Sequence, residues 1–199
     1  MQDDTFPPVI FFLLLSNALI FVGGQFMPQF GLIIGANFAL YSFPELFAPW
    51  QLVSYSFLHG SVMHLAVNMF ALWMFGRTME VVWGSRRFLI YYFVCVLGAA
   101  AAQLALAAIT GDPSVTVGAS GGVFGVLLAF GMTFPNQRIL LLFPPIPLPA
   151  KYFVLLYGIV ELYLGFSRAN TGVAHFAHLG GMVVGFLLII YWRSQRRIR

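Results

Sequence analysis

The sequence predicts an all-α membrane protein, a bundle of six transmembrane helices with a long interfacial connection after the first helix. Apolar residues make up 60% of the 199 residues and charged residues 8%, whereas a soluble domain has about 25% charged residues. The mean hydropathy is +0.89. One stretch, Phe88 to Ile109, contains no Asp, Glu, Lys or Arg and exceeds the roughly 20 apolar residues that span a hydrocarbon core. The bundle is therefore expected to have lipid as its main solvent.

Six segments have the length and apolar character of spans. They are residues 9–26, 62–79, 88–107, 120–134, 152–164 and 174–192. No polar linker or low-complexity stretch separates two folding units, so residues 1–199 are expected to form one membrane domain. The first span is expected to be retained, because residues 1–6 carry two acids and lack the basic region of a signal peptide.

Between the first and second spans lies a long aromatic connection, residues 27–61, which Pro28, Pro44 and Pro49 interrupt. Prolines oppose a continuous spanning helix, whereas short helices with aromatic anchors suit the headgroup region. The connection is therefore expected to lie in the outer interface. Residues 143–149 contain four prolines and are expected to form a turn after the fourth span.

Basic residues divide unevenly between the two sides of the six predicted spans. One, Arg168, falls on the side away from the termini, and the other nine fall on the side of the termini: Arg77, Arg86, Arg87, Arg138, Lys151, Arg193, Arg196, Arg197 and Arg199. Cytoplasmic loops carry the excess of Lys and Arg. Both termini are therefore expected in the cytoplasm, in a cell membrane, most simply a bacterial inner membrane. The net charge of +4 follows this topology, so no nucleic-acid partner is expected.

Polar side chains within spans are costly and usually face a bundle interior or a watery cavity. The second span opens with His59, His64 and Asn68, the fourth with Ser120, and the sixth with His175 and His178. His64 and Asn68 are four residues apart and therefore share a helix face. Each of these groups can point into one cavity.

Ser120 lies at the start of the fourth span, in the pattern Gly118-x-Ser120-x-Gly122. Taken alone this match is weak, because the soluble hydrolases that use it place a strand before the serine. Glycines at this point, including Gly118 and Gly121, still allow close approach of a substrate backbone. The amides of Ser120 and Ala119 at the positive end of the helix favour an oxyanion.

Together these residues resemble the rhomboid family of intramembrane serine proteases, over nearly the whole chain. The resemblance rests on His59-x4-His64-x3-Asn68, on Gly118-Ala119-Ser120-Gly121 with Phe124, and on Ala177-His178-Leu179-Gly180-Gly181. The chain is also similar to the compact six-helix bacterial type of this family. One departure is Trp50-Gln51, where the family often has Trp-Arg, so a cation is missing at Gln51.

The resemblance implies that Ser120 is the nucleophile and His178 the general base and then acid. Asn68 and His64 are implied as the side-chain part of the oxyanion hole, and Phe124 as the ring on which His178 packs. Substrates are implied to be single-span membrane proteins cut near the outer end of the helix. No cofactor is expected.

A Ser-His dyad without a third member is expected, because no motif places Glu161, the one acid inside a later span, beside a histidine. His59 and His175 are expected to be structural. A metal site is not expected, since the histidines lack carboxylate and cysteine partners in a recognised spacing. Gly181 and Gly185 form a GxxxG pair that favours close packing of the sixth span on the fourth.

Two further interpretations stay open. A catalytically inactive rhomboid-like protein would bind transmembrane helices without cutting them, although such relatives typically lack the serine or histidine that this chain keeps. A transporter is the more distant alternative. The polar connection at residues 165–172, between the fifth and sixth spans, is expected to be a movable cover over Ser120. The sequence leaves the oligomeric state open.

Overall fold

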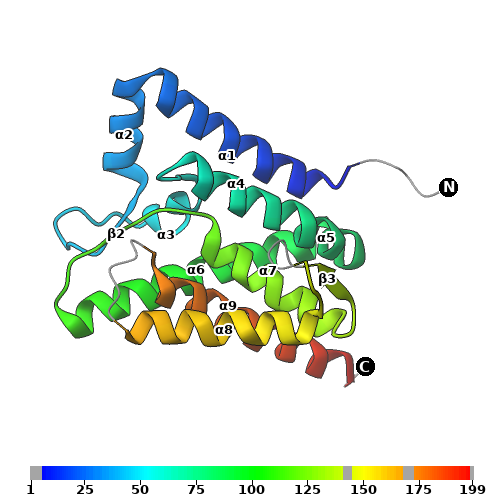
Figure 1. The fold of residues 1–199 in the computed structure, drawn as a ribbon. Coiled ribbons are helices and arrows are strands. Elements are labelled where there is room, and N and C mark those ends of the chain that lie inside the picture. The colour runs from blue at the N-terminus through cyan, green and yellow to red at the C-terminus, as the bar shows by residue number, and fades with distance from the viewer. Residues whose placement is uncertain (1–5, 141–144, 168–172, 198–199) are drawn as a thin grey trace.

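A computed structural model describes residues 6–140, 145–167 and 173–197 of the chain. The described residues form a bundle of helices with two small two-stranded sheets (Figure 1). The longer helices are α1 (Pro8–Phe26), α2 (Pro28–Phe38), α4 (Val62–Ala71), α5 (Arg77–Trp83), α6 (Ser85–Thr110), α7 (Ser120–Thr133), α8 (Ala150–Phe166) and α9 (His175–Arg197). The short elements are α3 (Gln51–Ser54), the 3₁₀ turn η1 (Tyr55–Phe57), the π-helical segment η2 (Leu72–Gly76), and the strands β1 (Leu40–Tyr41), β2 (Val115–Thr116), β3 (Arg138–Leu140) and β4 (Pro147–Pro149).

Each of the six predicted spans is helical. Among the described residues, α1, the continuous α4–η2–α5 helix, α6 and α9 are long and apolar enough to cross a membrane. The prediction of an all-α membrane bundle is confirmed. Helices α7, with 14 residues, and α8, with 17 residues, are shorter, at a rise of about 1.5 Å per residue. That these two also cross the membrane stays a prediction.

The core lies where α9 packs against α6, α7 and α8. Large side chains of α6, among them Phe88, Tyr91 and Tyr92, are fully buried there. The Tyr91 hydroxyl donates to the carbonyl of Gly125 on α7 at 2.8 Å, so the polar end of this core side chain is paired. Cys95 is buried against the same helices. Large apolar side chains on α1 and α8 face outward instead, as lipid requires.

Glycines let α7 and α9 approach closely. A Cβ added at Gly181 on α9 would collide with the carbonyl oxygen of Gly121 on α7. One at Gly121 would in turn strike Ala99 of α6. Small residues at such crossings allow backbones to touch, and this crossing is the close packing of the sixth span on the fourth that the sequence predicts. Gly185 instead faces Tyr91 and Cys95 of α6.

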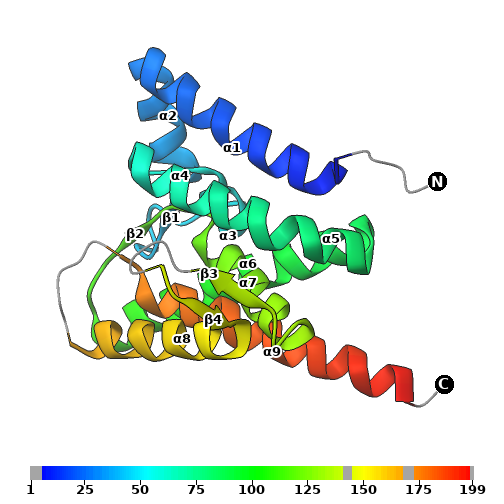
Figure 2. The ribbon, with the colours of Figure 1, turned by 45° about the vertical axis from the view of Figure 1, so that its right-hand side comes forward.

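The first connection consists of short helices, as predicted, and not of a spanning one. Helix α2 turns back from α1 after Pro28, and α3 with η1 leads into α4 (Figures 1 and 2). Gln51 is buried and holds this segment together. Its Nε2 donates to the carbonyl of Leu46 at 3.0 Å, and its Oε1 accepts from the amide of Tyr41 at 3.3 Å. At the position where the resemblance leads us to expect arginine, the neutral side chain of Gln51 therefore stabilises the segment by hydrogen bonds.

The region after α7 differs from the sequence prediction. Residues 143–149 were expected to form only a turn, but Pro147–Pro149 is strand β4, antiparallel to β3, with Leu148 opposite Ile139. Proline is tolerated here because the sheet has two strands and each is an edge. A second pair joins β1 to β2, with Leu40 opposite Thr116, and ties the first connection to the approach to α7.

Helix α1 is tied to α5 by a buried carboxylate. Glu80 accepts from the amides of Val9 and Ile10, at 3.0 and 2.8 Å, and from the Ser85 hydroxyl at 2.7 Å. The first amides of a helix have no partner within it, so a carboxylate at that end satisfies them and complements the helix dipole.

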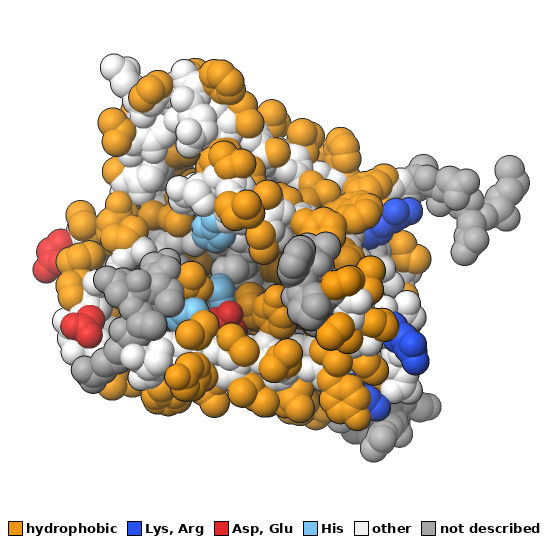
Figure 3. Space-filling view, viewed as in Figure 1, with side chains coloured by type: hydrophobic (Ala, Val, Ile, Leu, Met, Phe, Trp, Pro, Cys, Tyr) orange, Lys and Arg blue, Asp and Glu red, His pale blue; other side chains and the backbone are white. Residues whose placement is uncertain are grey.

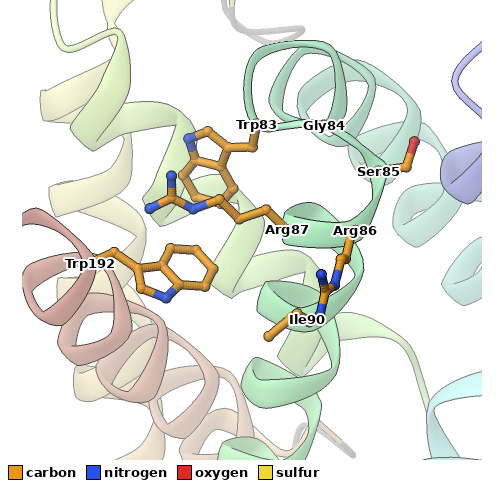
Figure 4. Close-up of a pocket in the computed structure, with 7 residues that line it drawn as sticks. All are labelled: Trp83, Gly84, Ser85, Arg86, Arg87, Ile90 and Trp192. Atoms are coloured by element: carbon orange, nitrogen blue, oxygen red, sulfur yellow. The ribbon is translucent and has the colours of Figure 1, made fainter. Parts of the chain in front are cut away.

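Helix α1 begins and α9 ends at the same end of the bundle (Figures 1 and 2). At this end Trp83, Arg87 and Trp192 line a pocket of about 550 Å³. The Arg87 guanidinium lies 4.2 Å from the ring centroid of Trp192, between the two indoles (Figure 4). Basic and aromatic side chains of this kind are typical of a membrane–water interface.

Candidate active site

Histidine side chains surround a hollow in the middle of one face of the molecule, with an acidic side chain beside two of them (Figure 3). Ser120 is the first residue of α7 and is half-buried. The chain enters this helix through Gly118, whose φ of 127° is a conformation that favours glycine. The Gly118 amide donates to the carbonyl of Tyr55 at 2.9 Å, so the turn before the serine is fixed to η1.

The Ser120 hydroxyl is paired with His178 of α9. Ser120 Oγ and His178 Nε2 are 2.7 Å apart, which is a hydrogen-bond distance. The imidazole stacks on Phe124, with ring centroids 4.3 Å apart and an angle of 8° between planes. Phe124 is one turn after Ser120 on α7, so one helix supplies both the hydroxyl and the surface that orients its partner. The structure brings these three predicted site residues together.

A carboxylate does lie beside His178, and the expectation that none does is wrong. Glu161 Oε2, on α8, is 2.9 Å from His178 Nδ1 and 2.7 Å from His175 Nδ1. All three side chains are buried, with 6 to 7% of each residue exposed. His175, for which a structural role is expected, contacts the same carboxylate. The sequence motif gave no sign of this because Glu161 lies in a different helix from both histidines.

His64 lies directly beside the serine. A Cβ placed on Gly118 would be 2.7 Å from His64 Nε2 and 3.7 Å from Ser120 Oγ, so the imidazole tip and the hydroxyl flank the same point. The second predicted donor, Asn68, is buried and its Nδ2 donates to the His64 carbonyl at 2.9 Å. A side-chain amide has two N–H groups, so this bond leaves one for another acceptor.

His59 packs edge-on against His64, with ring centroids 4.9 Å apart. Burial lowers the pKa of His59 to about 4, and the nearby His64 adds to that effect. The His59 ring is therefore neutral at neutral pH and supports His64 by packing. That arrangement agrees with the structural role expected for His59.

Backbone amides complete the surroundings of the hydroxyl. Ala119 is fully buried and precedes α7 as its N-cap, and Ser120 opens the first turn. The first amides of a helix lack intrahelical acceptors and attract negative charge. The amides at the start of α7 and the His64 imidazole therefore lie next to Ser120 Oγ, whereas the oxyanion-hole role expected for these groups and for Asn68 stays a prediction.

Glu161, His175 and His178 also form, among the described residues, a group of potential metal ligands whose donor atoms lie within 4.8 Å of one another. Two histidines and a carboxylate suit zinc, and this set weakens the sequence argument that a carboxylate ligand is missing. The separations of 2.7 and 2.9 Å are those of hydrogen bonds. That the protein works without a metal or other cofactor stays a prediction. The predicted cover over the site, residues 165–172, falls largely outside the described residues.

The fold and the site define a helical membrane protein in which a half-buried serine on one helix contacts a buried histidine on a neighbouring helix. Comparison with known proteins gives the family. The family model described as Rhomboid domain matches residues 47–195, about three quarters of the chain. This protein belongs to the rhomboid family.

Several rhomboid proteins are similar to the chain. Rhomboid protease GluP of Bacillus subtilis is 32% identical over 142 residues, which cover 69% of this chain and 25% of GluP. Rhomboid protein 1, mitochondrial, of Saccharomyces cerevisiae is 33% identical over 142 residues, which cover 69% of this chain and 40% of the yeast protein. Presenilin-associated rhomboid-like protein A, mitochondrial, of Danio rerio is 32% identical over 150 residues, which cover 70% of this chain and 38% of the Danio rerio protein. The matched part is thus less than half of each of these relatives.

Proposed function

We propose that this protein is an intramembrane serine endopeptidase that cuts transmembrane segments of membrane proteins. The observation that carries the proposal is the 2.7 Å contact between Ser120 Oγ and His178 Nε2 inside a membrane bundle. A serine is a weak nucleophile until an adjacent base takes its proton, and this imidazole is in position to do so. Membership of a family that includes Rhomboid protease GluP supports the same reaction.

In the proposed reaction, Ser120 Oγ forms a bond to a backbone carbonyl carbon while its proton moves to His178 Nε2. The resulting oxyanion is held by the amides of Ala119 and Ser120, with His64 and Asn68 as side-chain donors. The peptide C–N bond then breaks, and His178 gives the proton to the leaving nitrogen. Water hydrolyses the acyl-enzyme by the same proton path. No step calls on a cofactor.

The substrates are proposed to be single-span membrane proteins that enter from the lipid. A helical peptide bond is shielded by its own hydrogen bonds, so segments with Gly or Pro, which unwind easily, should be cut first. The site lies away from the basic end of the bundle (Figure 3). Cleavage is therefore proposed near the outer end of the substrate helix.

The test is cleavage of a single-span reporter protein in liposomes by the wild type, by Ser120→Ala and by Ser194→Ala. Ser194 is exposed near the end of α9, so its variant is a matched control that should cut at the wild-type rate. Ser120→Ala should fall to the background rate. Labelling of Ser120 by a fluorophosphonate provides a second measurement that does not depend on the choice of substrate.

If the wild type neither cuts any reporter in a panel of helices nor reacts with the fluorophosphonate, the proposal is wrong. The remaining interpretation would then be an inactive rhomboid-like protein that binds transmembrane helices. Equal cutting by wild type and Ser120→Ala would also overturn it, because the activity would then come from elsewhere.

A further inference from the structure

Glu161 is a buried carboxylate that the proposed reaction does not yet use. It lies on α8, whose other buried positions, Ala150, Phe153 and Val154, are apolar. A charge within a membrane helix is expensive unless it is paired. Its position seven residues after Val154 places it on the buried face of the helix, toward α9. Because burying this charge is unfavourable, we expect Glu161 to have a specific partner.

The partners of Glu161 are the two histidines of α9. Its Oε2 atom accepts from His175 Nδ1 and from His178 Nδ1, at 2.7 and 2.9 Å. The opposite nitrogen of His178, Nε2, faces the Ser120 hydroxyl at 2.7 Å. One imidazole therefore bridges the carboxylate and the serine.

This bridge selects one tautomer of His178. A neutral imidazole has one N–H and one bare nitrogen. To accept the Ser120 proton, Nε2 must be the bare nitrogen, so the hydrogen must be on Nδ1. A carboxylate oxygen next to Nδ1 stabilises that tautomer, because it can only accept. When Nε2 takes up the proton, the ring becomes a cation beside an anion.

We propose that Glu161 is a positioning residue, which holds His178 in the tautomer and orientation that activate Ser120 and stabilises the imidazolium. The inference rests on the proposed peptidase function and extends it from a dyad to a Ser120–His178–Glu161 relay. His175 supports the relay from the other side, since its Nδ1 donates to the same oxygen. Phe124 holds the plane of the His178 ring by stacking, and Glu161 holds the ring's orientation within that plane and keeps the hydrogen on Nδ1.

A purely structural role makes a different prediction. If Glu161 only joined α8 to α9, replacing it would lower thermal stability and would change catalysis in proportion to the loss of folded protein. A positioning role lowers kcat of folded enzyme and leaves KM nearly unchanged, because the substrate does not touch Glu161. Thermal stability and kinetics therefore have to be measured on the same samples.

The experiment compares wild type, Glu161→Gln, Glu161→Asp and the control Glu45→Gln, using a single-span reporter in liposomes. Glu45 is an exposed acid in the first connection, and its variant should match the wild type. The amide of Gln can donate to Nδ1 and favour the wrong tautomer, so kcat should fall about 100-fold or more, toward the roughly 10⁴-fold loss seen when a soluble serine protease loses the charge of its aspartate. Asp keeps the charge on a side chain one methylene shorter, so its kcat should be intermediate.

Folded Glu161→Gln with a wild-type kcat would overturn the inference while the peptidase function stands. If Glu161→Gln does not fold, Glu161→Asp decides: a reduced kcat at the wild-type melting temperature supports the relay, and a wild-type kcat overturns it. Cleavage that a chelator abolishes and added zinc restores would also overturn it, in favour of a metal site on the same side chains. A wild type that neither cleaves nor labels would refute the peptidase function itself.

Discussion

At the scale of single residues, polar groups from three helices meet at one hydroxyl, that of Ser120. His64 approaches from α4, the amides come from the start of α7, and His178 comes from α9. These groups belong to three different helices, so no single helix movement aligns them. The arrangement is present without a substrate, as the proposed electrostatic stabilisation of an oxyanion requires.

Asn68 gives the first prediction at this scale. Its Nδ2 already bonds the His64 carbonyl, so one N–H remains for the donor role proposed for it. We expect Asn68→Ala to lower kcat by roughly 100- to 1000-fold, the usual cost of one oxyanion donor, with KM changed little. The measurement is steady-state cleavage of the reporter in liposomes. A loss confined to KM would show that Asn68 binds the substrate and does not stabilise the transition state.

Phe124 gives the second prediction at the scale of single residues. Its ring is nearly parallel to that of His178, and aromatic contacts of this kind contribute about 0.5–1.5 kcal/mol beyond burial. Phe124→Leu keeps the apolar volume and removes the flat surface, so we expect kcat/KM to fall about 2- to 12-fold. Phe124→Tyr retains the ring and is the matched control. Equal rates for Leu and Tyr variants would mean that the stacking does not orient the imidazole.

The sequence alone gave Ser120, His178, His64, Asn68 and Phe124, because each belongs to a motif with fixed spacing on one helix. The carboxylate was missed because its partner is on another helix. The usable signal was the cost of an acid within the apolar segment that became α8. What the sequence could not give is the rotation of α8 about its axis, since that depends on side-chain packing between α8 and α9.

At the scale of elements, helix positions followed from apolar run length, whereas the paired strands did not. Strands β3 and β4 are stabilised by tertiary pairing of residues such as Leu148 and Ile139, and short proline-rich segments carry no strand periodicity. The same holds for β1 and β2, which pair the first connection with the segment before α7. Local patterns predict helices that cross a membrane because the bilayer itself fixes their length.

The crossing of α7 and α9 gives a prediction at this scale. A side chain at Gly181 would meet the Gly121 carbonyl, and overpacking of a close contact typically costs about 1–3 kcal/mol. We expect Gly181→Val to lower the melting temperature and to lower fluorophosphonate labelling of Ser120 further than the loss of folded protein explains, because His178 is displaced. Gly35→Ala is the control, since a Cβ there has no neighbour within 4 Å. Normal labelling in Gly181→Val would contradict the idea that this crossing positions the pair.

The junction of α1 with α5 gives the next prediction. Glu80 satisfies two amides at the start of α1, and hydrogen bonds to a charged group are worth about 1.5–3 kcal/mol each. We expect Glu80→Ala to lower stability by about 2 kcal/mol or more, which corresponds to roughly 4–8 °C for a chain of this size. Thermal melting in detergent measures it, and Glu45→Ala is the exposed control. Equal melting temperatures for the two variants would show that solvent or lipid replaces the cap.

At the scale of the whole molecule, charged side chains are distributed unevenly between the two ends of the bundle. On the face that Figure 3 shows, the Lys and Arg side chains lie toward the end where α1 begins and α9 ends, and acidic side chains lie at the opposite end and beside the histidines in the middle. The site opens between these ends, in the apolar middle. Under the proposed function, the orientation of the bundle would decide which half of a substrate helix meets Ser120.

The last prediction tests that orientation. The chain has a single cysteine, Cys95, which is fully buried, so the wild type is an unreactive background for a membrane-impermeant maleimide. Asp112→Cys places a thiol just after the end of α6, and Ser194→Cys places one near the end of α9, at the opposite end of the bundle; both positions are exposed. Because Lys and Arg gather on the cytoplasmic side, intact cells should label Asp112→Cys and spare Ser194→Cys.

Permeabilised cells should label both variants, which controls for the reactivity of each thiol, and the wild type should stay unlabelled in either condition. The reverse pattern in intact cells would place the termini outside, and the proposed cut near the outer end of the substrate helix would then move to the inner end. Equal labelling in intact cells would mean that the protein adopts both orientations, and the nine-to-one division of basic residues expected from the sequence would not control insertion.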